Sequence, residues 1–332
     1  MKPVKPNLTL SSRLLLLVLV VFLQSCMDKA GVWKNEEIKS GKREDFRMLN
    51  EQVFKLLKAN DPKQLRVFMS KELLENTYMP RLIELISNRL ADDNYNMLDE
   101  YYVINRYKDY DTIKAVGADK NSYGLYYQGI TREMYFSFYT PKRGDNKYVI
   151  TVAFAKYDYG WKISQLDLAP YTINGKTAPE LFKMAKEEYA KNYLIDAVNN
   201  MALATSCLKP CDMWQYPDEA DISEFYTKIA DEANERYKFP FTLTAVPTKP
   251  RIIRVYTETV SQGSFPMVYY LSSIKLTDTV ALKKENAMIR KTIGTVMPGI
   301  DKDNKYIFYS AFNTGRDGRK TADHYEFTDK LQ

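Results

Sequence analysis

The thiols of Cys207 and Cys211 are the reactive side chains whose spacing is most informative in this chain. In an ideal helix the Cβ atoms of residues four apart lie about 5–6 Å from each other, farther than the roughly 3.8 Å that a disulfide requires. Pro210 lies between the two cysteines and should end a helix there, which removes this obstacle. We therefore expect a disulfide between Cys207 and Cys211. A metal site is the less favoured alternative, because a second pair of ligands is missing.

Catalytic chemistry has few other candidates in the sequence. His324 is the single histidine, so any nucleophile–histidine pair has to use it. The phosphate-binding motif GxxxxGK[ST], the dinucleotide motif GxGxxG and the zinc motif HExxH are all absent. We therefore expect no catalytic residue, no metal and no cofactor, and a protein that is not an enzyme.

The N-terminus has the pattern of an export signal. Lys2, Lys5 and Arg13 precede a run of apolar residues, Leu14 to Leu23, and a small residue, Ser25, follows the run. A basic segment, a short apolar segment and a small residue at the cleavage point make a secretory signal peptide. A transmembrane anchor is the alternative, but spanning a bilayer takes about 20 apolar residues.

The end of this leader, Leu23-Gln24-Ser25-Cys26, resembles the lipobox of bacterial lipoproteins. The resemblance implies that residues 1–25 are removed and that Cys26 is fatty-acylated, for example with palmitate, and tied to a membrane of the cell envelope. Met27, rather than an aspartate, follows the cysteine, which favours the outer over the inner membrane. Such an oxidising compartment is also where disulfides form.

The charge of the chain argues against a nucleic-acid partner. The formal net charge is +6. Three of the positive charges lie in the leader, which leaves about +3 on the mature chain. The sequence has no basic run dense enough for a nucleic-acid surface. The partners we expect are the membrane, through lipid on Cys26, and an envelope protein or a glycan.

Tyrosine is abundant, with 26 residues, and many of them lie between residues 101 and 139. An amphipathic ring can stack on a sugar or contact a partner protein, although tyrosine is also simply favoured in strands. We select Tyr126 and Tyr135 from this region, and Trp161 from the later stretch 161–168, as candidate binding residues.

The order of the helices and strands expected around these residues predicts an α+β fold. After the leader and a polar tether over residues 26–43, apolar residues recur at helical spacing from Glu44 to Leu90, with Asp61 and Pro62 suited to begin a helix. Four β-rich runs follow, predicted over 101–107, 125–130, 134–139 and 147–157, and a last strand over 161–168 completes one antiparallel sheet. The first domain is therefore predicted over residues 44–171.

This first domain resembles the NTF2-like cone, in which helices precede an antiparallel sheet. The resemblance is carried by Asn60-Asp61-Pro62, by Ser70-Lys71-Glu72-Leu73 and by Tyr159-Gly160-Trp161-Lys162-Ile163. It implies a concave sheet that can hold a ligand. The superfamily includes enzymes and binding modules, so it does not decide between them.

Two further parts complete the chain. Residues 178–238 are predicted to form a helical spacer, in which the stretch 180–208 resembles a single tetratricopeptide hairpin that turns at Asn192-Tyr193. Residues 240–332 are predicted to form a β-β-α-β-β domain. The whole sequence indicates an envelope lipoprotein that acts as a non-catalytic binding or assembly module. The alternative is an enzyme that uses the cavity of the first domain, with a carboxylate such as Asp99 or Asp167.

Overall fold

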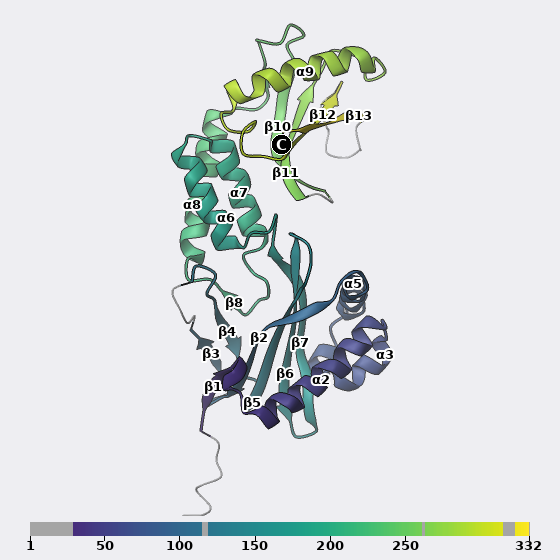
Figure 1. Ribbon diagram of the computed structural model, residues 1–332, viewed down its shortest axis with the longest axis vertical. Coiled ribbons are helices and arrows are strands. Elements are labelled where there is room, and N and C mark those ends of the chain that lie inside the picture. Colours follow the sequence, from purple (N-terminus) through teal and green to yellow (C-terminus); the bar gives the residue numbers. More distant parts are fainter. Residues whose placement is uncertain (1–28, 115–118, 261–262, 315–322, 332) are drawn as a thin grey trace, which may run out of the picture.

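The computed structural model describes residues 29–114, 119–260, 263–314 and 323–331. Figure 1 shows three parts that follow one another along the long axis of the molecule: a sheet with helices, a helical middle, and a second sheet with one long helix. The α+β class predicted from the sequence is confirmed. One buried hydrophobic core runs from the first sheet through the helices into the second sheet, so the three parts are packed together.

The helices of the first part cover one face of an antiparallel sheet. The helices are α2 (Ser40–Lys58), α3 (Pro62–Leu65), α4 (Lys71–Leu74) and α5 (Met79–Asp92). Asp61 caps α3 as predicted, because its carboxylate accepts a hydrogen bond from the backbone N–H of Gln64. Ser70 caps α4 in the same way.

The sheet has the strand order β1-β2-β5-β6-β7. Its strands are β1 (Gly31–Lys34), β2 (Tyr95–Ile104), β5 (Glu133–Pro141), β6 (Lys147–Tyr157) and β7 (Gly160–Thr172). Alternate residues of β6 enter two different cores, with Ile150 facing the helices and Val149 facing the opposite side. This strand is therefore buried on both faces.

Two expectations for this part need correction. The segment predicted as a tether contains β1, which pairs with β2 from Gly31 opposite Ile104, and α2 begins at Ser40. The strand predicted over 125–130 does not join the main sheet. It forms β4 (Gly124–Gln128) of a separate three-stranded sheet, between β3 (Tyr110–Ile113) and β8 (Trp214–Gln215). Because β8 comes from beyond the first two helices of the middle part, local sequence pattern could not reveal this pairing.

The helical middle consists of α6 (Ala178–Ala190), α7 (Leu194–Ser206) and α8 (Glu219–Arg236). Thr177 and Glu180 form a capping box at the start of α6. The chain turns between α6 and α7 at Asn192, whose φ of 63° is a left-handed conformation that asparagine tolerates. The predicted helical hairpin and its turn are therefore present.

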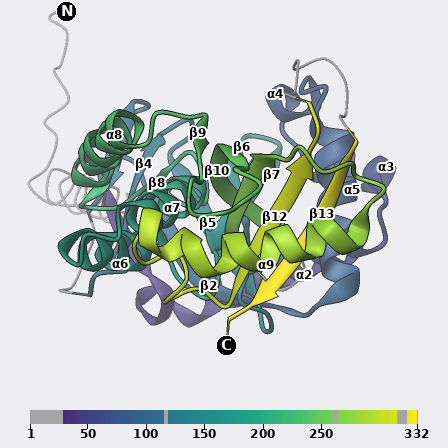
Figure 2. The same cartoon turned by 90° about the horizontal axis from the view of Figure 1, so that it is seen from above.

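The last part is a mixed sheet with the order β13-β12-β11-β10-β9. Its elements are β9 (Phe241–Thr242), β10 (Arg251–Val260), β11 (Gly263–Leu271), α9 (Thr279–Val296), β12 (Tyr306–Phe312) and β13 (His324–Lys330). The strands β11 and β12 are parallel, and α9 is the crossover that connects them. Figure 2 shows α9 lying across this sheet.

Candidate ligand-binding groove

The two described cysteines, Cys207 and Cys211, neither form a disulfide nor present a reactive thiol. Cys26 lies outside the described residues. Cys207 and Cys211 are both buried free thiols, so the structure does not contain the predicted disulfide. The Sγ atom of Cys207 points back along α7 toward the carbonyl oxygens of Leu203 and Ala204. Burial raises the pKa of each thiol to about 12, which makes both unreactive as they stand.

Tyr135 lies in the core and cannot contact a ligand, contrary to the role expected for it. Its ring stacks on Phe46 with a centroid distance of 3.9 Å. Its hydroxyl donates to Glu100 Oε2 at 2.6 Å and accepts from the Asn50 amide at 3.0 Å. Burial also raises the pKa of Tyr135 far above its ordinary value. The residue faces the helices because successive residues of β5 alternate between the two faces of the sheet.

Trp161 lies on the same face of the sheet as Tyr135 and is only partly buried. Its ring meets the ring of Phe46 edge-on at a centroid distance of 5.1 Å. Tyr126 belongs instead to β4 in the small sheet. The structure therefore does not bring the three predicted binding residues together into one site.

Tyr126 alone of the three borders an open groove, which we call the tyrosine groove. The groove has a volume of about 800 Å³ and follows β7, the edge strand of the main sheet, between α4–α5 and the small sheet. Three tyrosines on its wall are exposed: Tyr78 by 80%, Tyr110 by 58% and Tyr126 by 43%. The rings of Tyr110 and Tyr126 are stacked, with centroids 5.2 Å apart and planes inclined by 14°.

Polar groups lie along the same groove. Gln165 and Asp167 are two residues apart on β7, and the Gln165 amide donates a hydrogen bond to the Asp167 carboxylate. Burial raises the pKa of Asp167, the Gln165 hydrogen bond opposes this effect, and the nearby carboxylate of Asp212 adds to the rise. The groove thus combines exposed aromatic faces with an amide and two carboxylates.

Sequence reasoning missed Tyr78 and Tyr110. Tyr78 is the N-cap residue of α5, and Tyr110 is the first residue of β3. The sequence feature that could have identified them is their position beside polar turns, where a large aromatic ring has no hydrophobic core to pack into. Their approach to Tyr126 depends on the pairing of β3 with β4 and on the packing of α5.

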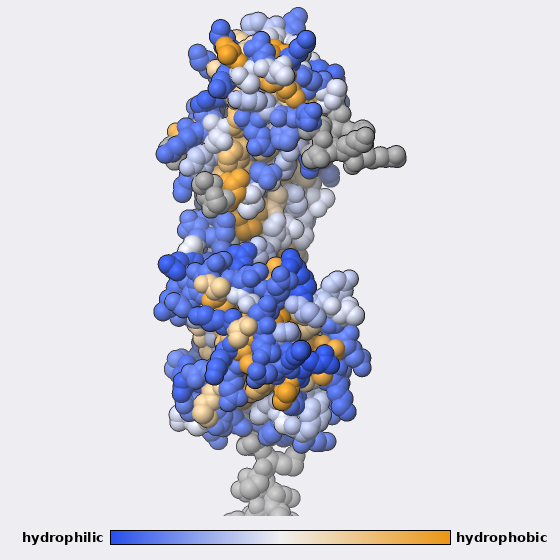
Figure 3. All heavy atoms as spheres, turned by 90° about the vertical axis from the view of Figure 1, so that its right-hand side faces the viewer, coloured by the Kyte–Doolittle hydropathy of each residue, from blue (hydrophilic) through white to orange (hydrophobic). Residues whose placement is uncertain are grey.

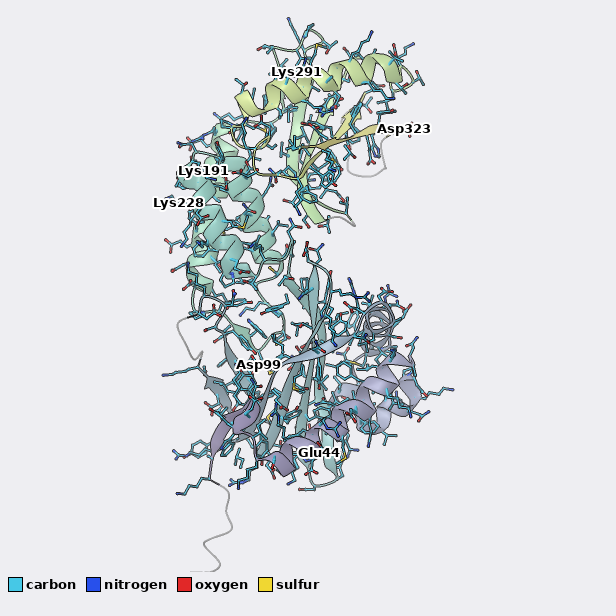
Figure 4. All side chains as sticks on the ribbon, viewed as in Figure 1. Glu44, Asp99, Lys191, Lys228, Lys291 and Asp323 are labelled. Carbon is cyan, nitrogen blue, oxygen red and sulfur yellow. The ribbon has the colours of Figure 1, made fainter. Side chains whose placement is uncertain are left out.

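Asp99, the other carboxylate considered for catalysis, lies in the first part of the molecule (Figure 4) and is held by structural contacts. It accepts hydrogen bonds from the Tyr123 hydroxyl at 2.6 Å and from the Asn35 amide at 2.8 Å, and it pairs with Lys34 at 3.0 Å. The contact with Lys34 connects β1 to β2, and the contact with Tyr123 connects β2 to the segment before β4. These structural contacts explain the Asp99 carboxylate without a catalytic role.

The described part of the chain offers neither a metal-binding cluster nor a membrane span. Within it, no group of three or more histidine, cysteine, aspartate or glutamate side chains is placed to hold a metal ion. None of the helices described is both long enough and apolar enough to cross a bilayer.

Comparison with known proteins does not assign the chain to a family. No family model, no curated protein and no solved structure matches the sequence or the fold.

Proposed function

We propose that this protein is an envelope lipoprotein, anchored through lipid on Cys26, whose tyrosine groove binds a glycan without chemically changing it. The observation that carries the proposal is the stacked, exposed pair Tyr110–Tyr126 in a groove that also holds Gln165 and Asp167. The flat C–H faces of a sugar ring pack on aromatic rings, and its hydroxyls need amide and carboxylate partners.

The groove favours a polar ligand over an extended protein contact, because Gln165, Asp167 and Asp212 line it. In the lower half of the face shown in Figure 3, apolar residues form groups that hydrophilic residues separate. A docking surface for a protein more often has a large continuous apolar patch. A volume of about 800 Å³ suits a ligand of a few sugar rings.

The location and the fold family form part of the same proposal. The lipobox-like sequence at Cys26 supports anchoring, with the outer membrane favoured. Helices followed by an antiparallel sheet support an NTF2-like first domain. Its main sheet is covered on both faces, so the groove along β7, rather than the interior of a cone, is the proposed binding site.

Isothermal titration of the mature chain with soluble oligosaccharides (maltotetraose, cellotetraose and chitotetraose) tests the function. Tyr126→Ala should weaken binding of the preferred sugar by about tenfold, because the loss of a stacked ring removes roughly 1.4 kcal/mol. Tyr159→Ala is the matched control, since Tyr159 is also exposed but does not border the groove. Equal weakening by both variants, or no binding of any sugar, contradicts the proposal.

A glycan-cleaving enzyme is the second candidate, favoured by one observation. Asp167 has a raised pKa beside a second carboxylate, Asp212, which is the pairing that glycoside hydrolysis uses. Turnover of a bound oligosaccharide by the wild type, abolished in Asp167→Asn while binding persists, would establish it. Binding without turnover supports the non-catalytic role.

A further inference from the structure

A basic hollow lies beside β1, at the end of the molecule where the chain enters the described structure. It has a volume of about 250 Å³. We call its lining residues the entry surface; they are Lys29, Trp33, Lys39, Lys42, Tyr102 and Ile104. The charged residues among them are all lysines, and none of the six lines the tyrosine groove.

The lysines of the entry surface are only partly neutralised. Lys29 and Lys39 are exposed, and their side chains form no ion pair with any described residue. Lys42 pairs with Glu133 at 3.4 Å, but this carboxylate also pairs with Lys156. One carboxylate therefore serves two lysines, and the surface keeps a positive charge that attracts anions.

Two carboxylates, Glu36 and Glu37, precede Lys39 in the chain and offset part of this charge. Glu36 pairs with Arg43 at 3.2 Å, and Glu37 accepts a hydrogen bond from the backbone N–H of Lys34 at 3.1 Å. Neither of the two lines the hollow. The charge that faces the hollow is therefore positive.

Aromatic and apolar side chains lie among these lysines. The Trp33 ring is partly exposed and stacks on Tyr102, with centroids 5.6 Å apart and planes inclined by 27°. Val32 is 42% exposed and Tyr107 is 74% exposed, and both line a second hollow that also borders β1. Tryptophan and tyrosine rings are favoured at the level of lipid headgroups, because one part of each ring is apolar and another is polar.

The place where the chain enters indicates which partner this surface meets. Lys29 is the first described residue, and Cys26 lies three residues before it. Three residues of chain span at most about 11 Å. An acyl chain on Cys26 would therefore keep the hollow close to the bilayer, at the end of the molecule opposite the last sheet (Figure 1).

We propose that the entry surface lies on the membrane and binds the phosphate groups of anionic phospholipids. This rests on the lipid anchor of the proposed function. Lys29, Lys39 and Lys42 donate to the phosphates, while Trp33 packs at the level of the headgroups. An acyl anchor combined with a basic surface holds a protein on a membrane more firmly than one acyl chain alone.

Co-sedimentation with lipid vesicles tests the surface separately from the anchor. The mature chain carrying Cys26→Ser cannot be acylated at this position, so its binding reports the surface. At about 20 mM salt it should bind vesicles of equal parts phosphatidylcholine and phosphatidylglycerol, and about 0.5 M salt should release it. Vesicles of phosphatidylcholine alone should not bind it.

Two triple variants in the same chain locate the binding. The variant Lys29→Gln/Lys39→Gln/Lys42→Gln should bind the anionic vesicles about tenfold more weakly or worse, because each lysine near a membrane adds to the attraction. The matched control is Lys228→Gln/Lys284→Gln/Lys291→Gln, which removes the same charge from exposed positions on α8 and α9 and should bind as before. Figure 4 labels Lys228 and Lys291, far from the chain entry.

Other outcomes overturn the proposal. No binding to the anionic vesicles, or equal binding to both kinds of vesicle, excludes a headgroup-binding surface. Equal weakening by the two triple variants assigns the attraction to net charge rather than to the entry surface. If the first variant does not fold, Lys29→Gln/Lys39→Gln, which changes two exposed side chains, decides in its place. Acylation of Cys26 is measured separately on the wild type, so a failed anchor and a failed surface are distinguished.

Discussion

At the scale of single residues, Asp196 on α7 is the described carboxyl whose pKa is raised most. Burial raises its pKa to about 7, and the charges of Glu188, Asp303 and Asp301 add to the effect, whereas the Asn304 hydrogen bond opposes it. Lys191 pairs with Glu188 and Asp303 and so offsets part of the negative charge of this group of acids. The folded protein therefore holds a proton on Asp196 at pH values where the unfolded chain releases it.

The stability of the protein should consequently fall as the pH rises from about 4 to about 7. The ordinary pKa of 3.8 is raised to about 7 on folding, so the stabilisation is complete below pH 3.8 and is lost as the pH passes 7. The loss is at most about 4 kcal/mol. Urea unfolding at pH 5 and pH 8 should show this decrease in the wild type, and Asp196→Asn should reduce it. If Asp196→Asn shows the same decrease in stability between pH 5 and pH 8, titratable groups other than Asp196 cause it.

At the scale of elements, the end of α7 decides the state of the two thiols. Cys207 is the residue at which α7 stops, and its Sγ atom bonds to carbonyl oxygens of the helix, whereas Cys211 lies near Asp167 and the backbone of Met213 and Trp214. The two side chains therefore have different surroundings, although the chain between them is short.

Alkylation with iodoacetamide distinguishes free thiols from the disulfide expected from the sequence. The native protein should resist labelling at pH 8, because both thiols are buried and have a pKa of about 12. After denaturation without reductant, the structure predicts two labels by mass spectrometry. No label on either cysteine under those conditions would show that the bridge forms in the envelope.

At the scale of the whole molecule, the tyrosine groove and the last sheet lie in different places along one axis. The chain enters the described structure next to β1, at the end of the molecule opposite the last sheet (Figure 1). The tyrosine groove belongs to the part nearest this entry. The lipid proposed on Cys26 would thus place the groove nearer the membrane than the last sheet.

Replacing the acylated residue tests the anchor. Cys26→Ala should move the protein from the membrane fraction to the soluble fraction or leave an uncleaved precursor, because stable retention needs two or more acyl chains. Met27→Ala keeps the cysteine and should remain membrane-bound. Density separation of the two membranes then tests the outer-membrane assignment. Unchanged acyl labelling in Cys26→Ala would refute lipidation at this residue.

The local features of this protein could be predicted from its sequence alone. The helix start at Asp61-Pro62, the helical hairpin around Asn192 and the last strands follow from caps, turn residues and hydrophobic period, which act over a few residues. The α+β class follows from the order of these elements. The export signal and Cys26 are also local patterns, and they remain predictions because they lie outside the described residues.

How the elements act together depends on the tertiary packing. Tyr135 turned inward because of its place on the pleat of β5, and β4 joined a strand that follows it by almost ninety residues. The contacts Asp196–Asn304 and Thr257–Asn199 likewise join residues far apart in the chain. Their partners are fixed by how whole faces pack, and a local pattern carries no information about which distant face will cover it.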